Sequence, residues 1–190
     1  MKIVLHVCCA PCLAGTLPAF KALGEVLPLF YNPNIHPLIE FRKRIRALEV
    51  FAEREGLPCE IDREYGLTRF LALVPPDGSG RCVRCYRERL GRTARRAAEL
   101  RADAFSSTLV SSTHQDHDAI RSVAEEAARE TGVPFLYQDL RHFAESGHQL
   151  ARKMSLYRQQ YCGCIFSEYE RFKDTNTEVH APGAKGSRGN

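Results

Sequence analysis

The stretch KIVLHVCCAPC, at residues 2–12, decides the fold. Its first six residues form a short apolar run with several β-branched side chains, which is typical of a buried strand. Pro11 and Gly15 follow soon afterwards, and we expect a helix from about Cys12 to Leu23. The cysteines therefore lie where a buried strand runs into a helix.

The rest of the chain repeats this alternation. We expect further strands at residues 25–32, 58–62, 104–110 and 133–140. We expect helices at residues 38–56, within 63–81, and at 82–102, 114–132 and 165–173. Such alternation predicts a single α/β domain over residues 1–173, with a mostly parallel sheet and helices on both faces. Residues 174–190 are small, polar and aperiodic, and we expect a disordered tail there.

The composition is that of an ordinary globular protein. Of its 190 residues, 44% are hydrophobic and 26% are charged, which excludes a mostly disordered or collagen-like chain. No stretch approaches the roughly 20 consecutive apolar residues of a membrane span. The N-terminus lacks the long apolar core of a signal peptide, so we expect a cytoplasmic protein with no membrane partner.

Seven of the eight cysteines form three tight clusters, which are Cys8, Cys9 and Cys12, then Cys82 and Cys85, then Cys162 and Cys164. Ligands of an open parallel sheet bind beyond the carboxyl ends of its strands, so the first cluster should lie at that edge. The other two clusters could converge on it. Clustered cysteines in a reducing compartment more often bind metal or do redox chemistry than form structural disulfides. We expect the eighth, Cys59, to be a small buried side chain within a strand.

The residues alone leave several chemistries open. Structural zinc favours two short cysteine knuckles, whereas four thiolates from two loops can hold a [4Fe–4S] cluster and would leave three thiols nearby. The C-G-C spacing of Cys162 and Cys164 is strained for a disulfide and typical of a labile one. Cys9-Ala-Pro-Cys12 is similar to a thioredoxin motif but leaves the other pairs unexplained. The alternatives are therefore a thiol–disulfide oxidoreductase and a zinc-stapled RNA-binding module without catalysis.

Arginines are concentrated between residues 81 and 101. The spacing of Arg89, Arg92 and Arg96 predicts one shared helix face, which we expect to bind nucleic-acid phosphates, although a merely solvated charged face is the alternative. Four more cations stand early in another helix, at Arg42, Lys43, Arg44 and Arg46. An RNA loop also needs aromatic rings for stacking, and four tyrosines flank the motifs: Tyr31, Tyr86, Tyr157 and Tyr161.

Five motifs together resemble the QueH-type epoxyqueuosine reductases. They are HVCCAPC (6–12), YNPNIHPLIEFRKR (31–44), RCVRCYRERLGRTA (81–94), STLVSS (107–112) and YRQQYCGCIFSE (157–168). The resemblance implies a Rossmann-like fold of the HUP type. It also implies that the chain is an oxidoreductase that removes the epoxide oxygen of epoxyqueuosine in a tRNA anticodon loop, the last step to queuosine.

The resemblance further implies roles for the cysteines. Cys8, Cys9, Cys82 and Cys85 match the positions that bind a [4Fe–4S] cluster. Cys162 and Cys164 match a redox-active pair, and Cys12 could bind a second metal ion, a mononuclear iron. Epoxide reduction needs two electrons and two protons. The C-G-C thiols could give them by closing a disulfide, or could hold an iron together with Cys12.

The remaining expectations concern the substrate. Tyr157, Arg158, Gln159 and Tyr161 should form part of the pocket around the modified base. Arg89, Arg92 and Arg96 should contact the phosphates of the tRNA. The reaction also implies an electron donor, whose identity the sequence does not indicate.

Overall fold

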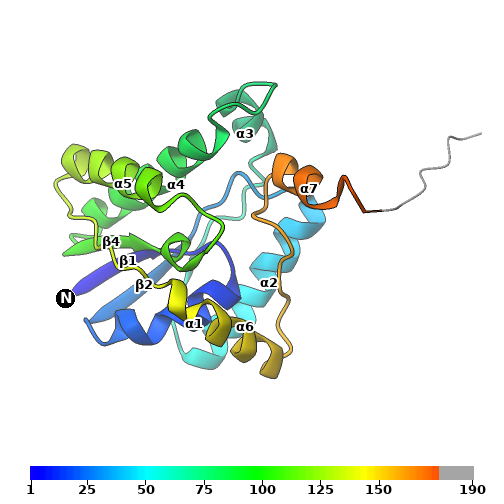
Figure 1. The fold of residues 1–190 in the computed structure, drawn as a ribbon. Coiled ribbons are helices and arrows are strands. Elements are labelled where there is room, and N and C mark those ends of the chain that lie inside the picture. Colours follow the sequence, from blue (N-terminus) through cyan, green and yellow to red (C-terminus); the bar gives the residue numbers. More distant parts are fainter. Residues whose placement is uncertain (176–190) are drawn as a thin grey trace, which may run out of the picture.

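A four-stranded parallel sheet forms the centre of the molecule in the computed structural model, which describes residues 1–175 (Figure 1). Its order is β3-β2-β1-β4, with Ile3 of β1 paired to Val26 on one side and Ala104 on the other. The strands are β1 (Lys2–His6), β2 (Glu25–Phe30), β3 (Glu60–Ile61) and β4 (Ala104–Ser107). This confirms the predicted α/β class, and the arrangement is Rossmann-like.

Helices cover both faces of the sheet, with α4 and α5 on one face and α1, α2 and α6 on the other (Figure 1). The helices are α1 (Ala10–Lys21), α2 (Leu38–Glu55), α3 (Leu67–Leu73), α4 (Arg81–Glu99), α5 (His117–Thr131), α6 (Ala144–Lys153) and α7 (Ile165–Phe172). There are also two short 3-10 helices: η1 (Thr108–Ser111) lies between β4 and α5, and η2 (Arg141–Phe143) directly precedes α6. Because β1 is covered on both sides, its residues Ile3, Val4 and Leu5 are completely buried. Burying each such side chain stabilises the folded state by about 1.5–3 kcal/mol relative to leaving it exposed to water.

Local signals begin and end the helices close to the predicted positions. The sulfur of Cys9 caps α1 by accepting the N–H of Cys12, and the carboxylate of Asp116 caps α5 in the same way. Gly56 ends α2 in the left-handed conformation, at φ +61°, which glycine adopts at little cost. These caps place the starts of α1 and α5 beyond the carboxyl edge of the sheet.

The expected strand at residues 133–140 is wrong. Only Phe135 joins the sheet there, through an isolated bridge to Phe105. Pro134 has no N–H to give to a ladder, and the hydroxyl of Ser106 instead donates to the carbonyl of Leu136. The neighbouring strand β4 is also shorter than expected, because the hydroxyl of Ser107 accepts the N–H of Leu109 and turns the chain into η1.

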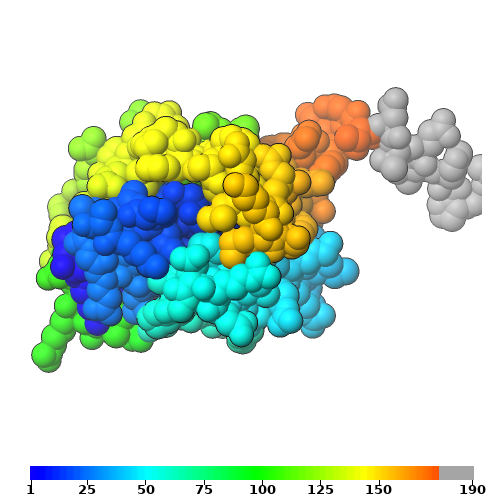
Figure 2. Space-filling model, turned by 90° about the horizontal axis from the view of Figure 1, so that it is seen from below, coloured from blue at the N-terminus to red at the C-terminus, as the bar shows by residue number. Residues whose placement is uncertain are grey.

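Helix α6 was not predicted. Gly147 stands in its middle and lowers its intrinsic helix propensity. The structure explains this glycine by a close approach to α1, since a Cβ on Gly147 would lie 2.3 Å from the carbonyl oxygen of Pro11 and one on Gly15 2.6 Å from that of Phe143. Figure 2 shows the α1 region in blue against the α6 region in gold. Packing of this kind cannot be seen in a single segment of sequence.

Within residues 1–175, no helix is long and apolar enough to cross a membrane. The predicted domain boundary at residue 173 falls directly after α7. The expected tail, residues 174–190, lies outside the described residues apart from its first two positions, so the tail stays a prediction.

Candidate metal and redox centre

The first cysteine group, Cys8, Cys9 and Cys12, lies between β1 and α1. The three sulfur atoms lie within 4.8 Å of one another, and those of Cys8 and Cys9 are 3.8 Å apart. In the described part of the chain, this is the only set of three or more cysteine, histidine or acidic side chains whose ligand atoms are that close. The end of a buried strand and a helix cap hold these thiols together, so the group could bind a metal ion.

The three thiols of this first group differ in how readily they ionise. Hydrogen bonding with the thiols of Cys12 and Cys9 holds the pKa of Cys8 well below the usual range. The pKa of Cys9 is raised by burial, and that of Cys12 is raised because its thiol is hydrogen-bonded to Cys8. Thr108 also contacts the Cys8 sulfur, at 3.5 Å. Since metals bind thiolates, Cys8 is the member best prepared to act as a ligand.

Gln159 is the one member of the predicted substrate pocket that contacts the first group. Its Nε2 donates to the sulfur of Cys9 at 3.0 Å, while its Oε1 is buried without a partner among the described residues. The hydroxyl of Tyr157 donates to Glu40, and that of Tyr161 donates to the carbonyl of His36 at 2.5 Å. Arg158 is exposed. The two tyrosines therefore hold the segment in place with their hydroxyl groups.

The second cysteine group consists of Cys82 and Cys85 near the start of α4 and Cys162 and Cys164 just before α7. All four line one small cavity of about 20 Å³. Burial raises the pKa of Cys85 to about 12 and also raises that of Cys162. All four are free thiols. The structure thus brings together two pairs that are far apart in the sequence.

These groupings differ from the predicted ligand set. The set Cys8, Cys9, Cys82 and Cys85 takes two members from each group, and the structure leaves it a prediction. One side chain connects the groups. Burial alone would lower the pKa of Arg89, but the charges of Cys85, Cys162 and Cys8 raise it, so this guanidinium lies within electrostatic reach of both groups.

Arg89 is only 1% exposed, which does not fit the predicted contact with tRNA phosphates. Its Nε reaches the carbonyl of Cys85 at 3.4 Å and its Nη1 the Oδ1 of Asn32 at 3.5 Å, both at the long end for hydrogen bonds. Its Nη2 has no partner, and no carboxylate pairs with it in residues 1–175. A buried charge without a counter-charge costs several kcal/mol. A thiolate-held, negatively charged metal group would supply that counter-charge, so the residues present fit one.

A second buried arginine, Arg44, fixes the C-G-C segment. It pairs with Glu40 at 2.7 Å and donates to the carbonyls of Tyr161 and Cys162 at 2.9 and 2.8 Å. In the sequence, Arg44 is one of four neighbouring cations, and this grouping does not reveal its buried role. Its spacing from two core residues, Phe41 and Leu48, was the available signal, because positions three and four apart share a helix face.

The glycine of the C-G-C segment is required by its surroundings. Gly163 has φ +132°, and a Cβ there would lie 3.0 Å from the Cγ1 of Ile35 and 3.2 Å from the Nη1 of Arg44. Asn34 lies beside it and lines the second group's cavity. Both polar atoms of the Asn34 side chain are buried without partners among the described residues. Asn34 was not singled out from the sequence, although it stands in the motif YNPNIHPLIEFRKR (31–44).

The other two arginines of the predicted phosphate face are held by acids. Arg96 binds Glu60 through two hydrogen bonds of 2.6 and 2.8 Å and also pairs with Glu99 at 2.9 Å. Arg92 lies 3.8 Å from Glu99. Their contact with tRNA stays a prediction, but these acids already compensate both charges.

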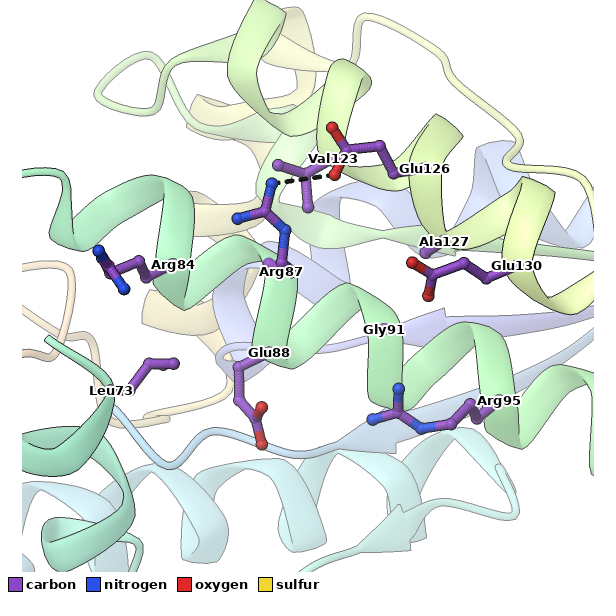
Figure 3. Close-up of a pocket in the computed structure, with 10 residues that line it drawn as sticks. All are labelled: Leu73, Arg84, Arg87, Glu88, Gly91, Arg95, Val123, Glu126, Ala127 and Glu130. Atoms are coloured by element: carbon purple, nitrogen blue, oxygen red, sulfur yellow. Dashed lines mark hydrogen bonds and ion pairs between the residues drawn. The ribbon is translucent and has the colours of Figure 1, made fainter.

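A surface pocket of about 310 Å³ lies between α4 and α5 (Figure 3). Arg84, Arg87 and Arg95 line it together with Glu88, Glu126 and Glu130. Arg87 forms an ion pair of 2.9 Å with Glu126 across the pocket (Figure 3). Because the lining arginines and glutamates are equal in number, the pocket offers no net charge to a polyanion.

Comparison with known proteins identifies the family of the chain. A family model described as "Epoxyqueuosine reductase QueH" matches residues 3–170. A protein of that name from Dehalococcoides mccartyi is 39% identical over 177 residues, covering 93% of this chain and 97% of the relative. Those from Thermotoga maritima and Histophilus somni are each 33% identical, covering 93% and 96% of this chain and 95% and 76% of the relatives. The chain therefore belongs to the QueH family of epoxyqueuosine reductases, which are oxidoreductases.

Proposed function

We propose that this chain reduces the epoxide of epoxyqueuosine in a tRNA anticodon loop to give queuosine, and that the two cysteine groups form the active site. The observation that carries the proposal is the gathering of seven cysteines into two groups, with Arg89 buried within electrostatic reach of both. The family membership favours this function over a thioredoxin-like enzyme or a zinc-stapled RNA-binding module. A tRNA substrate makes the cytoplasm the natural place for the reaction.

The proposed cofactor is a [4Fe–4S] cluster on Cys8, Cys9, Cys82 and Cys85, which would supply electrons one at a time when bound. Two features support it. The donor set consists of thiols, which are the soft ligands that such clusters take. The uncompensated guanidinium of Arg89 would balance part of the cluster's negative charge. Cys12, whose sulfur lies within 4.8 Å of the other two in its group, would hold a second, mononuclear iron.

The proposed electron source for the epoxide is the C-G-C pair. When the thiols of Cys162 and Cys164 join in a disulfide, they release two electrons and two protons. The epoxide takes up both electrons and both protons, its two C–O bonds break, a C=C bond forms, and the oxygen leaves as water. An external reductant must then restore the two thiols. The shared cavity and the strained ring of a C-G-C disulfide support this role.

Side chains on the segment before the C-G-C pair would hold the modified base. Gln159 supports this role, because its Nε2 is bound to Cys9 while its Oε1 is free to accept a hydrogen bond from the substrate. Arg158 is exposed beside it and would contact a phosphate. The rings of Tyr157 and Tyr161 would provide stacking surfaces, since hydrogen bonds fix their hydroxyl groups.

The test is conversion of the substrate by the anaerobically purified protein. We expect a brown protein that, with a strong reductant and tRNA carrying epoxyqueuosine, yields queuosine, detected by mass spectrometry as the loss of one oxygen atom. A colourless protein with bound zinc and an unchanged nucleoside would contradict the proposal.

A further inference from the structure

We propose that the tRNA docks on the start of helix α2 and the segment beside it, through the exposed cations Arg42, Lys43, Arg46 and Arg158. This inference rests on the proposed function and assigns the surface that recognises the substrate. It replaces the predicted face on α4. Three observations support it: the attachment of α2 to the C-G-C segment, the distribution of unpaired charge, and exposed apolar side chains nearby.

The start of α2 is fixed directly against the proposed redox pair. Arg44 donates to the carbonyls of Cys162 and Tyr161, and the N–H of His36, just before the helix, donates to the carbonyl of Gly163 at 2.7 Å. Figure 1 shows the start of α2 close to the chain that leads into α7. An RNA loop that reaches the C-G-C pair would therefore come close to the first turns of α2.

The cations of this surface are free to bind phosphates. Arg42, Lys43 and Arg46 are exposed, and none of the three pairs with an acid in the described part of the chain. Arg158 is also exposed and unpaired within residues 1–175. The ammonium group of Lys43 lies 5.3 Å from the ring centroid of Tyr157, which joins the helix to the segment carrying Arg158. The basic surface is thus continuous from α2 to residue 158.

The exposed cations of α2 follow its first turn, at Arg42, Lys43 and Arg46. The second half of the helix is mainly acidic, with Glu49, Glu53 and Glu55 beside the single cation Arg54. The helix dipole favours acids near the N-terminus and cations near the C-terminus. Glu40 in the first turn and Arg54 in the last turn follow this rule. The dipole therefore does not explain the cations that lie between them in the first half of the helix, whereas phosphate binding does.

The charges on α4 contrast with those on α2. Arg89 is buried, and Glu60 and Glu99 compensate Arg92 and Arg96. The pocket between α4 and α5 combines arginines with an equal number of glutamates (Figure 3). Arg84 and Arg95 in this pocket form no ion pair among the described residues, but the three glutamates beside them leave the pocket with no net charge. On α2 a polyanion would meet exposed cations that no acid pairs with in the described part of the chain.

Exposed apolar side chains lie close to the same segment. Ile39, on the first turn of α2, is 64% exposed, and Tyr169, on α7 just after the C-G-C pair, is 67% exposed. Unpaired bases of an RNA loop stack on exposed aromatic rings. Cations for the phosphates and a ring for a base are the two features that an anticodon loop requires.

The test measures how a labelled, unmodified tRNA anticodon stem–loop transcript binds to the full chain at several salt concentrations. Three variants are compared with the wild type. They are R42Q/K43Q/R46Q on α2, R87Q/R95Q/R129Q as a control that removes the same number of exposed charges from α4 and α5, and R92Q/R96Q on the face first predicted. Thermal unfolding of each variant verifies that it is folded.

We expect the α2 variant to bind the transcript at least tenfold more weakly and the others to stay within about twofold of the wild type. Each lost phosphate contact lowers the slope of log K against log salt by about 0.7–0.9, so the α2 variant should lose about two to three units of slope. Wild-type binding by the α2 variant, equal losses in all three variants, or a larger loss in R92Q/R96Q would overturn the inference. If the triple variant does not fold, the single variants R42Q and R46Q are measured instead. Each should lower the slope of log K against log salt by about 0.7–0.9, the value for one phosphate contact. Unchanged slopes in both would overturn the inference as well.

Conversion of epoxyqueuosine at saturating tRNA separates this inference from the proposed function. The α2 cations do not touch the reacting atoms, so the α2 variant should still convert its substrate when RNA is in excess. A wild type that binds the transcript but converts nothing would contradict the proposed function. A wild type that converts normally while the α2 variant binds normally would contradict the inference alone.

Discussion

The two cysteine groups are assembled in different ways. Cys8, Cys9 and Cys12 come from one stretch of five residues, and the end of β1 and the cap of α1 set their sulfur atoms within 4.8 Å of one another. The second group joins the start of α4 to residues 162–164, which are far away in the sequence. The first group is thus a local product of the strand-to-helix junction. The second depends on long-range contacts to the C-G-C segment, among them those of Arg44 and of a tightly packed glycine.

The difference suggests a division of labour. Cysteines at a strand end and on a helix, as in Cys8, Cys9, Cys82 and Cys85, are suited to hold a cofactor throughout the catalytic cycle. A pair on a segment held by a few contacts is suited to change its bonding during turnover.

The largest expected effect comes from removing a proposed cluster ligand. Cys8→Ser and Cys82→Ser, one from each group, should each lose the bound iron and acid-labile sulfide and lower the free energy of unfolding, because metal binding is coupled to folding. Iron and sulfide analysis measures the loss. Cys59→Ser is the control, since Cys59 belongs to neither group and should keep full cluster content. A fully loaded Cys82→Ser protein would show that the first group binds the cluster without the second.

The next effect separates the cofactor from turnover. Cys164→Ser should keep the iron–sulfur spectrum and stop epoxide reduction, because four other cysteines complete the cluster while the disulfide can no longer form. A visible spectrum and mass spectrometry of the treated tRNA give both readouts on one preparation. Loss of the spectrum would mean that the ligand and redox roles are exchanged among the cysteine pairs, with Cys164 serving as a ligand.

A smaller effect tests how the second group is held. Gly163→Ala should lower the free energy of unfolding by about 1–3 kcal/mol, because a side chain is strained at φ +132° and its Cβ would press on Ile35 and Arg44. Denaturant titration measures the change. Gly132→Ala is the matched control, with a positive φ of +74° but open space around it. If both variants lost the same free energy of unfolding, packing against Arg44 would not contribute to the effect at Gly163.

The smallest effect concerns the charge between the groups. Arg89→Gln should make the reduction potential of the bound cluster more negative, because a nearby cation favours the added electron. A shift of about 59 mV for one electron corresponds to 1.4 kcal/mol, and we expect a change of this order. Arg92→Gln, at an arginine paired with Glu99, should leave the potential unchanged. Equal potentials in wild type and Arg89→Gln would show that Arg89 does not interact with the cluster.

The sequence predicts the features that depend on local patterns. The apolar run before Cys8, the left-handed position at Gly56 and the regular alternation of elements were enough for the parallel sheet and most of the helices. The expected strand at 133–140 does not form, because Pro134 has no backbone N–H to donate and the hydroxyl of Ser106 donates to the carbonyl of Leu136.

What the sequence does not predict depends on contacts between distant segments. Arg89 follows the periodicity of an exposed basic face, yet it is buried beside Cys85 and Asn32. Helix α6 packs closely on α1 where Gly147 meets Gly15, and the sequence around either glycine does not predict this contact. The pairing of Cys82 and Cys85 with the C-G-C segment is of the same kind. Charge and spacing indicate which residues are important, whereas tertiary packing decides which of them meet.

The most direct test of this division of labour is a single turnover without external reductant. The protein is reduced, freed of reductant, mixed with tRNA carrying epoxyqueuosine and then alkylated, and the cysteine peptides are analysed by mass spectrometry. We predict one disulfide between Cys162 and Cys164 for each queuosine formed, with Cys59 still alkylated. Queuosine formed while Cys162 and Cys164 both remain alkylated would contradict the account.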